Sequence, residues 1–294
     1  MIGVDVGGTK VLAALVDGEG NLGRHVERPT ELSSQERLIA EFAEIVDELR
    51  DDSIAGVGFG LPSRLNSRAG YVEASVNIPL ANVDLRGALE AHFGIPVALE
   101  NDGNAAALAE FAVGAGREAR TLVMLTLGTG VGGGVVIDGR LLRDAAELGH
   151  VVIDYDGIPC QGTCTGRGHL EAYASGTAAT RRAREAFGPD SDARQLVSLA
   201  LEQNEQALEI LREIGGRLGA AIGSFVNVFG PEIVVIGGGF AAAGDLILDA
   251  AHDLMLREAL PPWRDRVRIV RAELGARAGV IGAGLVAADA LAGS

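Results

Sequence analysis

The stretch Ile2-Gly-Val-Asp-Val-Gly-Gly-Thr-Lys-Val-Leu-Ala-Ala-Leu-Val16 decides the fold that we predict for this 294-residue chain. Apolar and small residues alternate up to Val6, Gly7-Gly8 interrupts them, and a second apolar run begins at Val11. This pattern predicts two strands joined by a glycine turn. Glycines let the backbone approach a ligand closely, and successive N–H groups at such a turn suit phosphate oxygens.

The same pattern returns later in the chain. A strand, a glycine-rich turn and a second strand are predicted to follow one another over residues 121–137. One constant offset relates Gly7 to Gly128 and Asp17 to Asp138. Two unrelated glycine hairpins would explain each half alone, but the shared offset favours an internal duplication. The sequence therefore predicts two related α/β domains that face each other.

Helical and strand patterns fill the rest of the chain. Helices are predicted over residues 34–50, 102–113, 170–187 and 192–230 and from about residue 278, and strands over residues 54–59, 96–99, 233–236 and 267–270. A third glycine run, Gly237-Gly238-Gly239, opens another predicted helix. No Walker loop and no convincing dinucleotide fingerprint is present. Three glycine turns on two duplicated halves predict instead a nucleotide held in a cleft between the domains.

Charge and hydropathy narrow the classes of partner. The 25 basic and 40 acidic residues give a formal charge of −15, which argues against nucleic acid and anionic membranes as partners. The N-terminus lacks the basic and apolar regions of a secretory signal. The apolar stretch at 218–240 is interrupted by Asn227, Pro231 and Glu232, so it predicts no membrane span. We therefore expect a cytoplasmic protein.

Five motifs together resemble a known family over essentially the whole chain. Asp5-Val-Gly-Gly-Thr-Lys10, Leu127-Gly-Thr-Gly-Val-Gly-Gly133 and Ile236-Gly-Gly-Gly239 resemble the first phosphate, second phosphate and adenosine motifs of actin-like ATPases. With Glu100-Asn-Asp102 and Glu147-Leu-Gly-His150, the chain more narrowly resembles the ROK family of sugar kinases. The resemblance implies two actin-like (ribonuclease H-like) α/β domains around an interdomain cleft. The first would comprise residues 1–115 and 279–294, and the second residues 116–278.

The resemblance also implies ATP with Mg²⁺ as the phosphoryl donor. Asp5 would hold Mg²⁺ through water. The nucleotide would be bound by Gly7, Gly8, Thr9, Lys10, Gly128, Thr129, Gly130, Gly237, Gly238 and Gly239. Lys10 is the only lysine among the 25 basic residues, and its compact ammonium suits a place near phosphate or a carboxylate. A homodimer or higher homo-oligomer is expected on the resemblance alone.

Asp102 is the candidate catalytic residue. An Asp that opens a helix is usually an N-cap, and the chain alone allows that interpretation. The resemblance implies instead a base that accepts the proton of the attacking sugar hydroxyl. It also implies that the sugar is bound by Asn77, Asn101, Asp102, Glu147, His150 and Glu171. For the glutamates the alternative is a solvated surface position, the commonest fate of Glu.

Two cysteines and two histidines predict a metal site. His150, Cys160, Cys164 and His169 are the ligand types that tetrahedral Zn²⁺ prefers, and a disulfide is disfavoured in a cytoplasmic protein. The family usually has one His with Cys-x-Cys-x4-Cys, so the cysteine spacing and His169 depart from its pattern. A reactive cysteine pair or labile disulfide remains the alternative. Pro62-Ser63 is a second departure, because the family usually has Pro-Gly there.

The predicted reaction is transfer of the γ-phosphoryl group of ATP to the 6-hydroxyl of glucose. Residues 174–185 resemble the glucose-phosphorylating bacterial branch of the family, which favours glucose over N-acetylmannosamine, mannose or fructose. A sugar-responsive regulator is a remote alternative, because family regulators carry a DNA-binding region before the first phosphate motif, which begins here at Asp5. Polyphosphate as an alternative donor stays open.

Overall fold

A computed structural model describes residues 1–144 and 146–292 and divides the chain into two compact units. Unit 1 comprises Met1–Arg117, Leu141–Ala146 and Glu273–Ser294, and unit 2 comprises Glu118–Arg140 and Glu147–Ala272. The domain bounds expected from the sequence stay a prediction. Residues 293–294 of the expected terminal helix lie outside the described residues.

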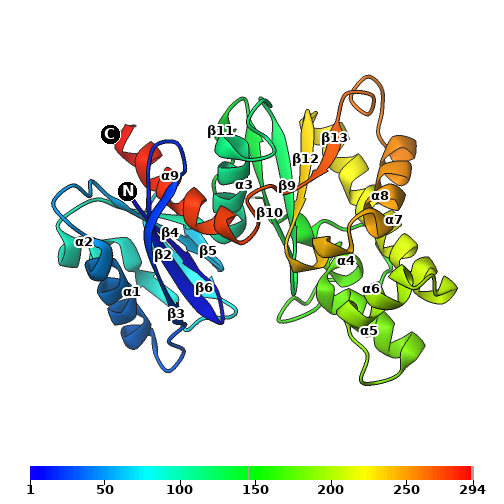
Figure 1. Ribbon diagram of the computed structural model, residues 1–294, viewed down its shortest axis with the longest axis horizontal. Coiled ribbons are helices and arrows are strands. Elements are labelled where there is room, and N and C mark those ends of the chain that lie inside the picture. Colours follow the sequence, from blue (N-terminus) through cyan, green and yellow to red (C-terminus); the bar gives the residue numbers. More distant parts are fainter. Residues whose placement is uncertain (145, 293–294) are drawn as a thin grey trace. The chain divides into compact units, whose positions relative to one another are not determined.

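Unit 1 is built on a five-stranded sheet (Figure 1). Its strands are β1 (Ile2–Val6), β2 (Lys10–Val16), β3 (Leu22–Pro29), β4 (Val57–Leu61) and β8 (Val97–Asn101), in the order β3-β2-β1-β4-β8. The pairs β1/β2 and β2/β3 are antiparallel, whereas β1/β4 and β4/β8 are parallel. The central strands β1 and β4 are almost entirely buried, as expected when helices cover both faces of a sheet.

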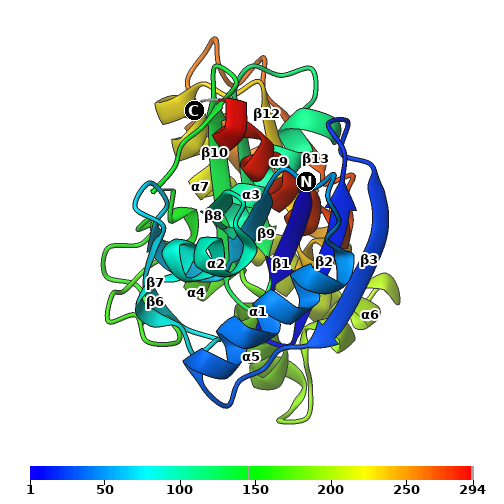
Figure 2. The same cartoon turned by 90° about the vertical axis from the view of Figure 1, so that its left-hand side faces the viewer.

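Helices cover each face of this sheet. Figure 2 shows α1 (Gln35–Leu49) and α2 (Leu85–Phe93) on one face, with α3 (Asp102–Val113) and α9 (Ala278–Ala292) behind the strands. Phe42 of α1 and Phe59 of β4 pack with ring centroids 5.4 Å apart in the larger core. The capping side chain of α1 is Ser34, which accepts the Arg37 N–H. The amphipathic pattern at 34–50 therefore predicted this helix correctly.

Several elements of unit 1 were not predicted from the sequence. They are the edge strand β3, the small sheet of β5 (Ser63–Asn66), β6 (Tyr71–Ser75) and β7 (Ala81–Asp84), and helix α2. Strand β3 is largely polar and half exposed, so it lacks the apolar run that marks a buried strand.

Unit 2 repeats the sheet of unit 1. Its strands are β9 (Leu122–Leu127), β10 (Val131–Ile137), β11 (Arg140–Leu141), β12 (Ile233–Gly237) and β13 (Arg268–Arg271), in the order β11-β10-β9-β12-β13. The pair β9/β10 is antiparallel, and β12 runs parallel to both β9 and β13. An antiparallel opening hairpin followed by parallel strands occurs at equivalent positions in both sheets. This common order confirms the duplication predicted from the glycine turns.

Two helices predicted as continuous are each broken. The segment 170–187 forms α4 (Glu171–Ala174) and α5 (Gly176–Phe187), and 192–230 forms α6 (Ala193–Leu201) and α7 (Glu205–Phe229). Ser175 is extended and its hydroxyl caps α5, while the Asn204 side chain caps α7. Ser and Asn favour caps over helix interiors, so these two residues carried the missed signal.

The helices of unit 2 pack at close range. Helix α7 lies along α8 (Asp245–Glu258), and Gly215 and Gly219 of α7 lie directly against backbone carbonyls of α8. Short 3₁₀ helices occur at Leu148–His150 and Gly239–Ala243 in unit 2 and at Gly275–Arg277 in unit 1.

Helix α9 is the most apolar helix of unit 1. Within the described part of the chain, the segment Gly275–Ala292, which contains α9, is long and apolar enough to cross a membrane by composition, with a mean hydropathy of 1.3. The stretch 218–240 is not such a segment, as expected. Gly3 of β1 and Gly58 of β4 lie against the backbone of α9, and Gly282 lies against the backbone of α3. Because α9 packs on β1, β4 and α3 at once, most of its surface is apolar.

We expect Gly282→Ala to destabilise unit 1. The added Cβ would overlap the Ala105 carbonyl oxygen, which belongs to the backbone of α3 and cannot move aside. Such overpacking costs about 1–3 kcal/mol of the free energy of unfolding. Gly216→Ala in α7 is the matched control, because a Cβ there meets only Leu254 Cδ2 at 3.9 Å. The control should gain up to about 1 kcal/mol from helix propensity. Urea unfolding of both variants measures these changes in the free energy of unfolding. A Gly282→Ala protein as stable as the parent would contradict the close contact between α9 and α3.

Candidate active site

Asp5 and Asp102 form an interacting pair of acids in unit 1. Strand β1 carries Asp5. Desolvation by burial, and secondly the charge of Asp102, raise the pKa of the Asp5 carboxyl to about 7, and Lys10 opposes this rise. A Cβ on Gly279, in the first turn of α9, would lie 2.5 Å from the Asp5 carboxyl carbon, so only glycine fits there. Two close carboxylates either share a proton or bind a cation.

Asp102 is the first residue of α3, and β8 leads directly into it. The N-cap is Asn101, whose Oδ1 accepts the N–H groups of Gly103 at 2.9 Å and Asn104 at 3.2 Å. The N-cap role considered for Asp102 therefore belongs to its neighbour. Because capping occupies Asn101 Oδ1, the side-chain NH₂ is the group that Asn101 can offer to a sugar hydroxyl.

Glu100 is a buried residue to which the sequence assigned no role. Its Oε1 accepts the Asn101 N–H and the Asn104 side-chain amide, both at 3.0 Å. Its Oε2 faces Arg143 Nη1 at 3.4 Å. Burial raises the pKa of this carboxyl, and the two hydrogen bonds and Arg143 oppose the rise. Glu100 thus holds the loop that presents Asn101 and the helix start, and its place in the Glu-Asn-Asp motif was the available signal.

Hydrogen bonds to its own carbonyl groups hold the first glycine turn in place. Gly7 N–H donates to the Lys10 carbonyl at 2.9 Å. Thr30 binds the turn twice, through its hydroxyl to the Gly7 carbonyl at 2.7 Å and through its N–H to the Thr9 carbonyl at 3.0 Å. Lys10 extends from the turn and pairs with Glu27 at 2.7 Å, with both side chains about half exposed. The lone lysine therefore lies beside a carboxylate.

Asn77 lies next to this turn. A Cβ built on Gly8 would be 3.1 Å from Asn77 Cβ, so the expected sugar-binding Asn77 and the phosphate turn are neighbours. Ser63, the departure from the family pattern, is buried and shares a 2.6 Å hydroxyl hydrogen bond with Ser75 across β5 and β6. Ser63 therefore stabilises the small sheet.

The second and third glycine runs are adjacent in unit 2. The second turn closes with a 2.9 Å hydrogen bond from Gly128 N–H to the Gly130 carbonyl. Gly238 has φ +87° and lies against the backbone of Leu127, where a side chain would not fit. The expected second phosphate and adenosine segments therefore meet at the end of β9.

The three predicted sugar ligands of unit 2 differ in setting. Glu171 is half-buried: its Oε2 accepts the Val131 N–H at 2.8 Å, and its Oε1 lies 3.9 Å from Cys160 Sγ. This position excludes the solvated-surface alternative for Glu171. Glu147 is exposed, and its Oε2 lies 3.8 Å from Nδ1 of His150. Glu147 and His150 therefore lie together, as the motif spacing predicted.

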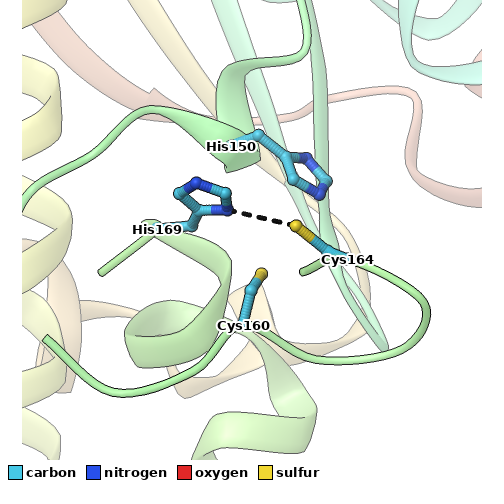
Figure 3. A group of neighbouring side chains, drawn as sticks. All are labelled: His150, Cys160, Cys164 and His169. Atoms are coloured by element: carbon cyan, nitrogen blue, oxygen red, sulfur yellow. Dashed lines mark hydrogen bonds between the residues drawn. The ribbon is translucent and has the colours of Figure 1, made fainter. Parts of the chain in front are cut away.

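The four predicted metal ligands converge in one place (Figure 3). Their ligand atoms, on His150, Cys160, Cys164 and His169, all lie within 4.8 Å of one another. Cys164 Sγ and His169 Nδ1 are 3.5 Å apart, close to the ~3.5 Å that tetrahedral Zn²⁺ imposes on a sulfur and a nitrogen ligand. Gly166 N–H donates to Cys164 Sγ at 3.4 Å, a contact typical of the surroundings of a metal-bound thiolate. The buried His150 Nδ1 has no hydrogen-bond partner among the described residues. This donor set fits zinc.

The two cysteines are free thiols, so the structure contains no disulfide between them. Burial, together with the neighbouring Cys164 and Glu171, raises the pKa of the Cys160 thiol to about 11. A thiol with this pKa is a poor nucleophile at neutral pH unless a cation binds it. The reactive-pair alternative is therefore the weaker one.

Comparison with known proteins agrees with the geometry. The ROK family profile matches residues 1–290. A glucokinase from Thermotoga maritima is 37% identical over 100% of this chain and 98% of its own length. The structure of a ROK hexokinase from Thermus thermophilus superposes with a TM-score of 0.88 at 35% identity, covering 100% of this chain and 99% of that one.

A second solved structure contains ligands. The ROK family glucokinase from Streptomyces griseus, in complex with glucose and AMPPNP, has a TM-score of 0.82 at 30% identity and covers 98% of this chain and 99% of its own. The family match covers both duplicated units. The chain therefore belongs to the ROK family.

Proposed function

We propose that this chain is an ATP-dependent kinase that transfers the γ-phosphoryl group of ATP to the 6-hydroxyl of glucose. The position of Asp102 is the main support for this proposal. Asn101 is the N-cap of α3, so Asp102 is not needed as the cap, and its charge interacts with that of Asp5. The glucokinase from Thermotoga maritima and the Streptomyces griseus enzyme with glucose and AMPPNP support glucose as acceptor and ATP as donor.

Asp102 acts as the base. Its carboxylate accepts the proton of the sugar hydroxyl as that oxygen attacks the γ-phosphorus. The start of α3 favours the charged form, since the partial positive charge of a helix N-terminus stabilises an anion. Asp5 would hold Mg²⁺ through water, and the ion would supply positive charge to offset the phosphate oxygens and this pair of acids.

The nucleotide is bound mainly by backbone groups. The turns at 7–10 and 128–130 take the phosphates, and residues 237–239 take the adenosine. With a formal charge of −15, the protein surface does not attract phosphate, so local N–H groups and the metal ion must do so.

The sugar hydroxyls are read by directional hydrogen bonds from Asn77, Asn101, Glu147, His150 and Glu171. Zn²⁺, bound by His150, Cys160, Cys164 and His169, would crosslink the loop 150–169 that precedes Glu171. The structure thus suits a structural zinc, which orders a glycine-rich segment. We further expect a cytoplasmic enzyme that forms a homodimer or a higher homo-oligomer.

A hexose panel tests the function directly. In a coupled ADP-release assay with ATP, glucose should give the highest kcat/KM among glucose, mannose, fructose and N-acetylmannosamine. A clear preference for another hexose would overturn the substrate and leave the kinase standing. No ADP release with any hexose would overturn the kinase.

Asp102→Asn should lower kcat roughly 10²–10⁴-fold with little change in the affinity for glucose, because a positioned base is lost while its shape is kept. The melting temperature should hardly change, since Asn101 provides the cap. Asp84→Asn is the matched control: it exchanges the N-cap of α2 and should leave kcat unchanged. Near-normal kcat with a lower melting temperature in Asp102→Asn would show a structural residue.

Metal analysis of protein purified without a His tag should find about one Zn²⁺ per chain. Cys164→Ala should lose the metal and weaken glucose binding, because His150 and Glu171 flank the same loop. Thr165→Ala, at an exposed position of that loop, is the control and should keep the zinc. Absence of zinc, with both cysteines readily alkylated in the native protein, would refute the site.

A further inference from the structure

The second glycine turn is anchored through its carbonyl oxygens. The Gly128 carbonyl accepts the N–H of Gly176, at the start of α5, at 2.8 Å. The Thr129 carbonyl accepts Nε2 of Gln161 at 3.0 Å. Both donors come from segments more than thirty residues away in sequence. The turn is therefore held from outside its own hairpin.

This anchoring decides where the N–H groups of the turn point. A trans peptide is planar, so the N–H of a residue points opposite to the carbonyl of the residue before it. The bond from Gln161 to the Thr129 carbonyl therefore directs the Gly130 N–H away from Gln161. The bond from Gly176 does the same for the Thr129 N–H. Consecutive N–H groups presented in this way make an anion-binding turn.

The orientation of the Gln161 amide is determined by its other partner. Ser175 is fully buried, and its Oγ accepts the Ala178 N–H at 3.0 Å as the cap of α5. The Ser175 hydroxyl then donates to Gln161 Oε1 at 3.3 Å, which leaves Nε2 to face Thr129. An amide satisfies both contacts, whereas a carboxylate would set an oxygen against the Thr129 carbonyl.

Gln161 belongs to the loop 150–169 that carries the four candidate metal ligands, called here the metal-ligand loop. It follows Cys160 directly in sequence. Glu171, just beyond the last ligand, binds the same turn through Val131 N–H, with its other oxygen 3.9 Å from Cys160 Sγ. One residue of this loop, Gln161, and one residue just after it, Glu171, therefore both hold the region of the second glycine turn.

We propose that Gln161 is a positioning residue for the nucleotide: it fixes the Thr129 peptide and thereby aims the Gly130 N–H at a phosphate oxygen. The metal-ligand loop consequently supports nucleotide binding as well as the sugar site. This inference rests on the proposed function, in which the turn at 128–130 binds the phosphates of ATP.

Calorimetric titration with Mg·AMPPNP, without sugar, tests the inference. Gln161→Met keeps the length of the side chain and removes both hydrogen bonds, so the affinity should fall about tenfold, equivalent to about 1.4 kcal/mol. Gln161→Glu should weaken binding further, because its carboxylate would repel both the Thr129 carbonyl and the phosphates. Gln206→Met, at an exposed position of α7, is the matched control and should bind like the parent.

Glucose affinity, zinc content and melting temperature separate positioning from structure. All three should stay at parental values in Gln161→Met while the KM for ATP rises and that for glucose does not. Equal AMPPNP affinity in parent and Gln161→Met would overturn the inference and leave the kinase intact. A joint loss of zinc, glucose affinity and melting temperature would show that Gln161 only supports the loop, which also overturns it. If the parent itself does not bind Mg·AMPPNP, the proposed function fails.

Discussion

Helix α9 packs closely against its neighbours in unit 1, and the positions of Asp5 and Asp102 depend on this packing. Gly3 and Gly58 bring the central strands against this helix, and Gly282 brings α3 against it. Strand β1 carries Asp5 and α3 begins with Asp102, so one helix sets the separation of the two acids. Gly279, in the first turn of α9, then lies directly against the Asp5 carboxyl. The packing of this helix thereby contributes to a pair of carboxylates whose charges interact.

The two glycine turns solve the same problem with different partners. In the proposed function, each turn presents N–H groups to a phosphate while its own carbonyls remain hydrogen-bonded. In unit 1, Thr30 binds the Gly7 and Thr9 carbonyls from the neighbouring strand segment. In unit 2, donors from Gln161 and Gly176 perform this task. Each of the two sheets therefore begins with a similar hairpin, and different segments outside the hairpin stabilise its turn in each unit.

An acidic protein that binds ATP needs groups at the binding site itself to attract phosphate, because its overall charge repels it. Backbone N–H groups carry no net charge, so they bind phosphate without changing the formal charge of −15. Lys10 pairs with Glu27, which leaves less positive charge for the nucleotide than the sequence motif indicated. In the proposed nucleotide site, the orientation of backbone N–H groups therefore matters more than side-chain charge. Residues that hold the glycine turns, such as Thr30 and Gln161, consequently become important for nucleotide binding.

By itself, the sequence determined the duplicated hairpins, helix α3 at its observed bounds, and the convergence of four candidate metal ligands, because these depend on local patterns and short spacings. The break at Ser175 and the cap at Asn101 had a local signal in their residue types that the prediction did not use. Tertiary structure alone decided other features, because strand β3 exists only through its pairing with β2. Glu100 forms an ion pair with Arg143, and Gln161 donates a hydrogen bond to the Thr129 carbonyl, so both roles depend on residues distant in the chain. Such contacts form only when the folded backbone brings the partners together, so no local pattern announces them.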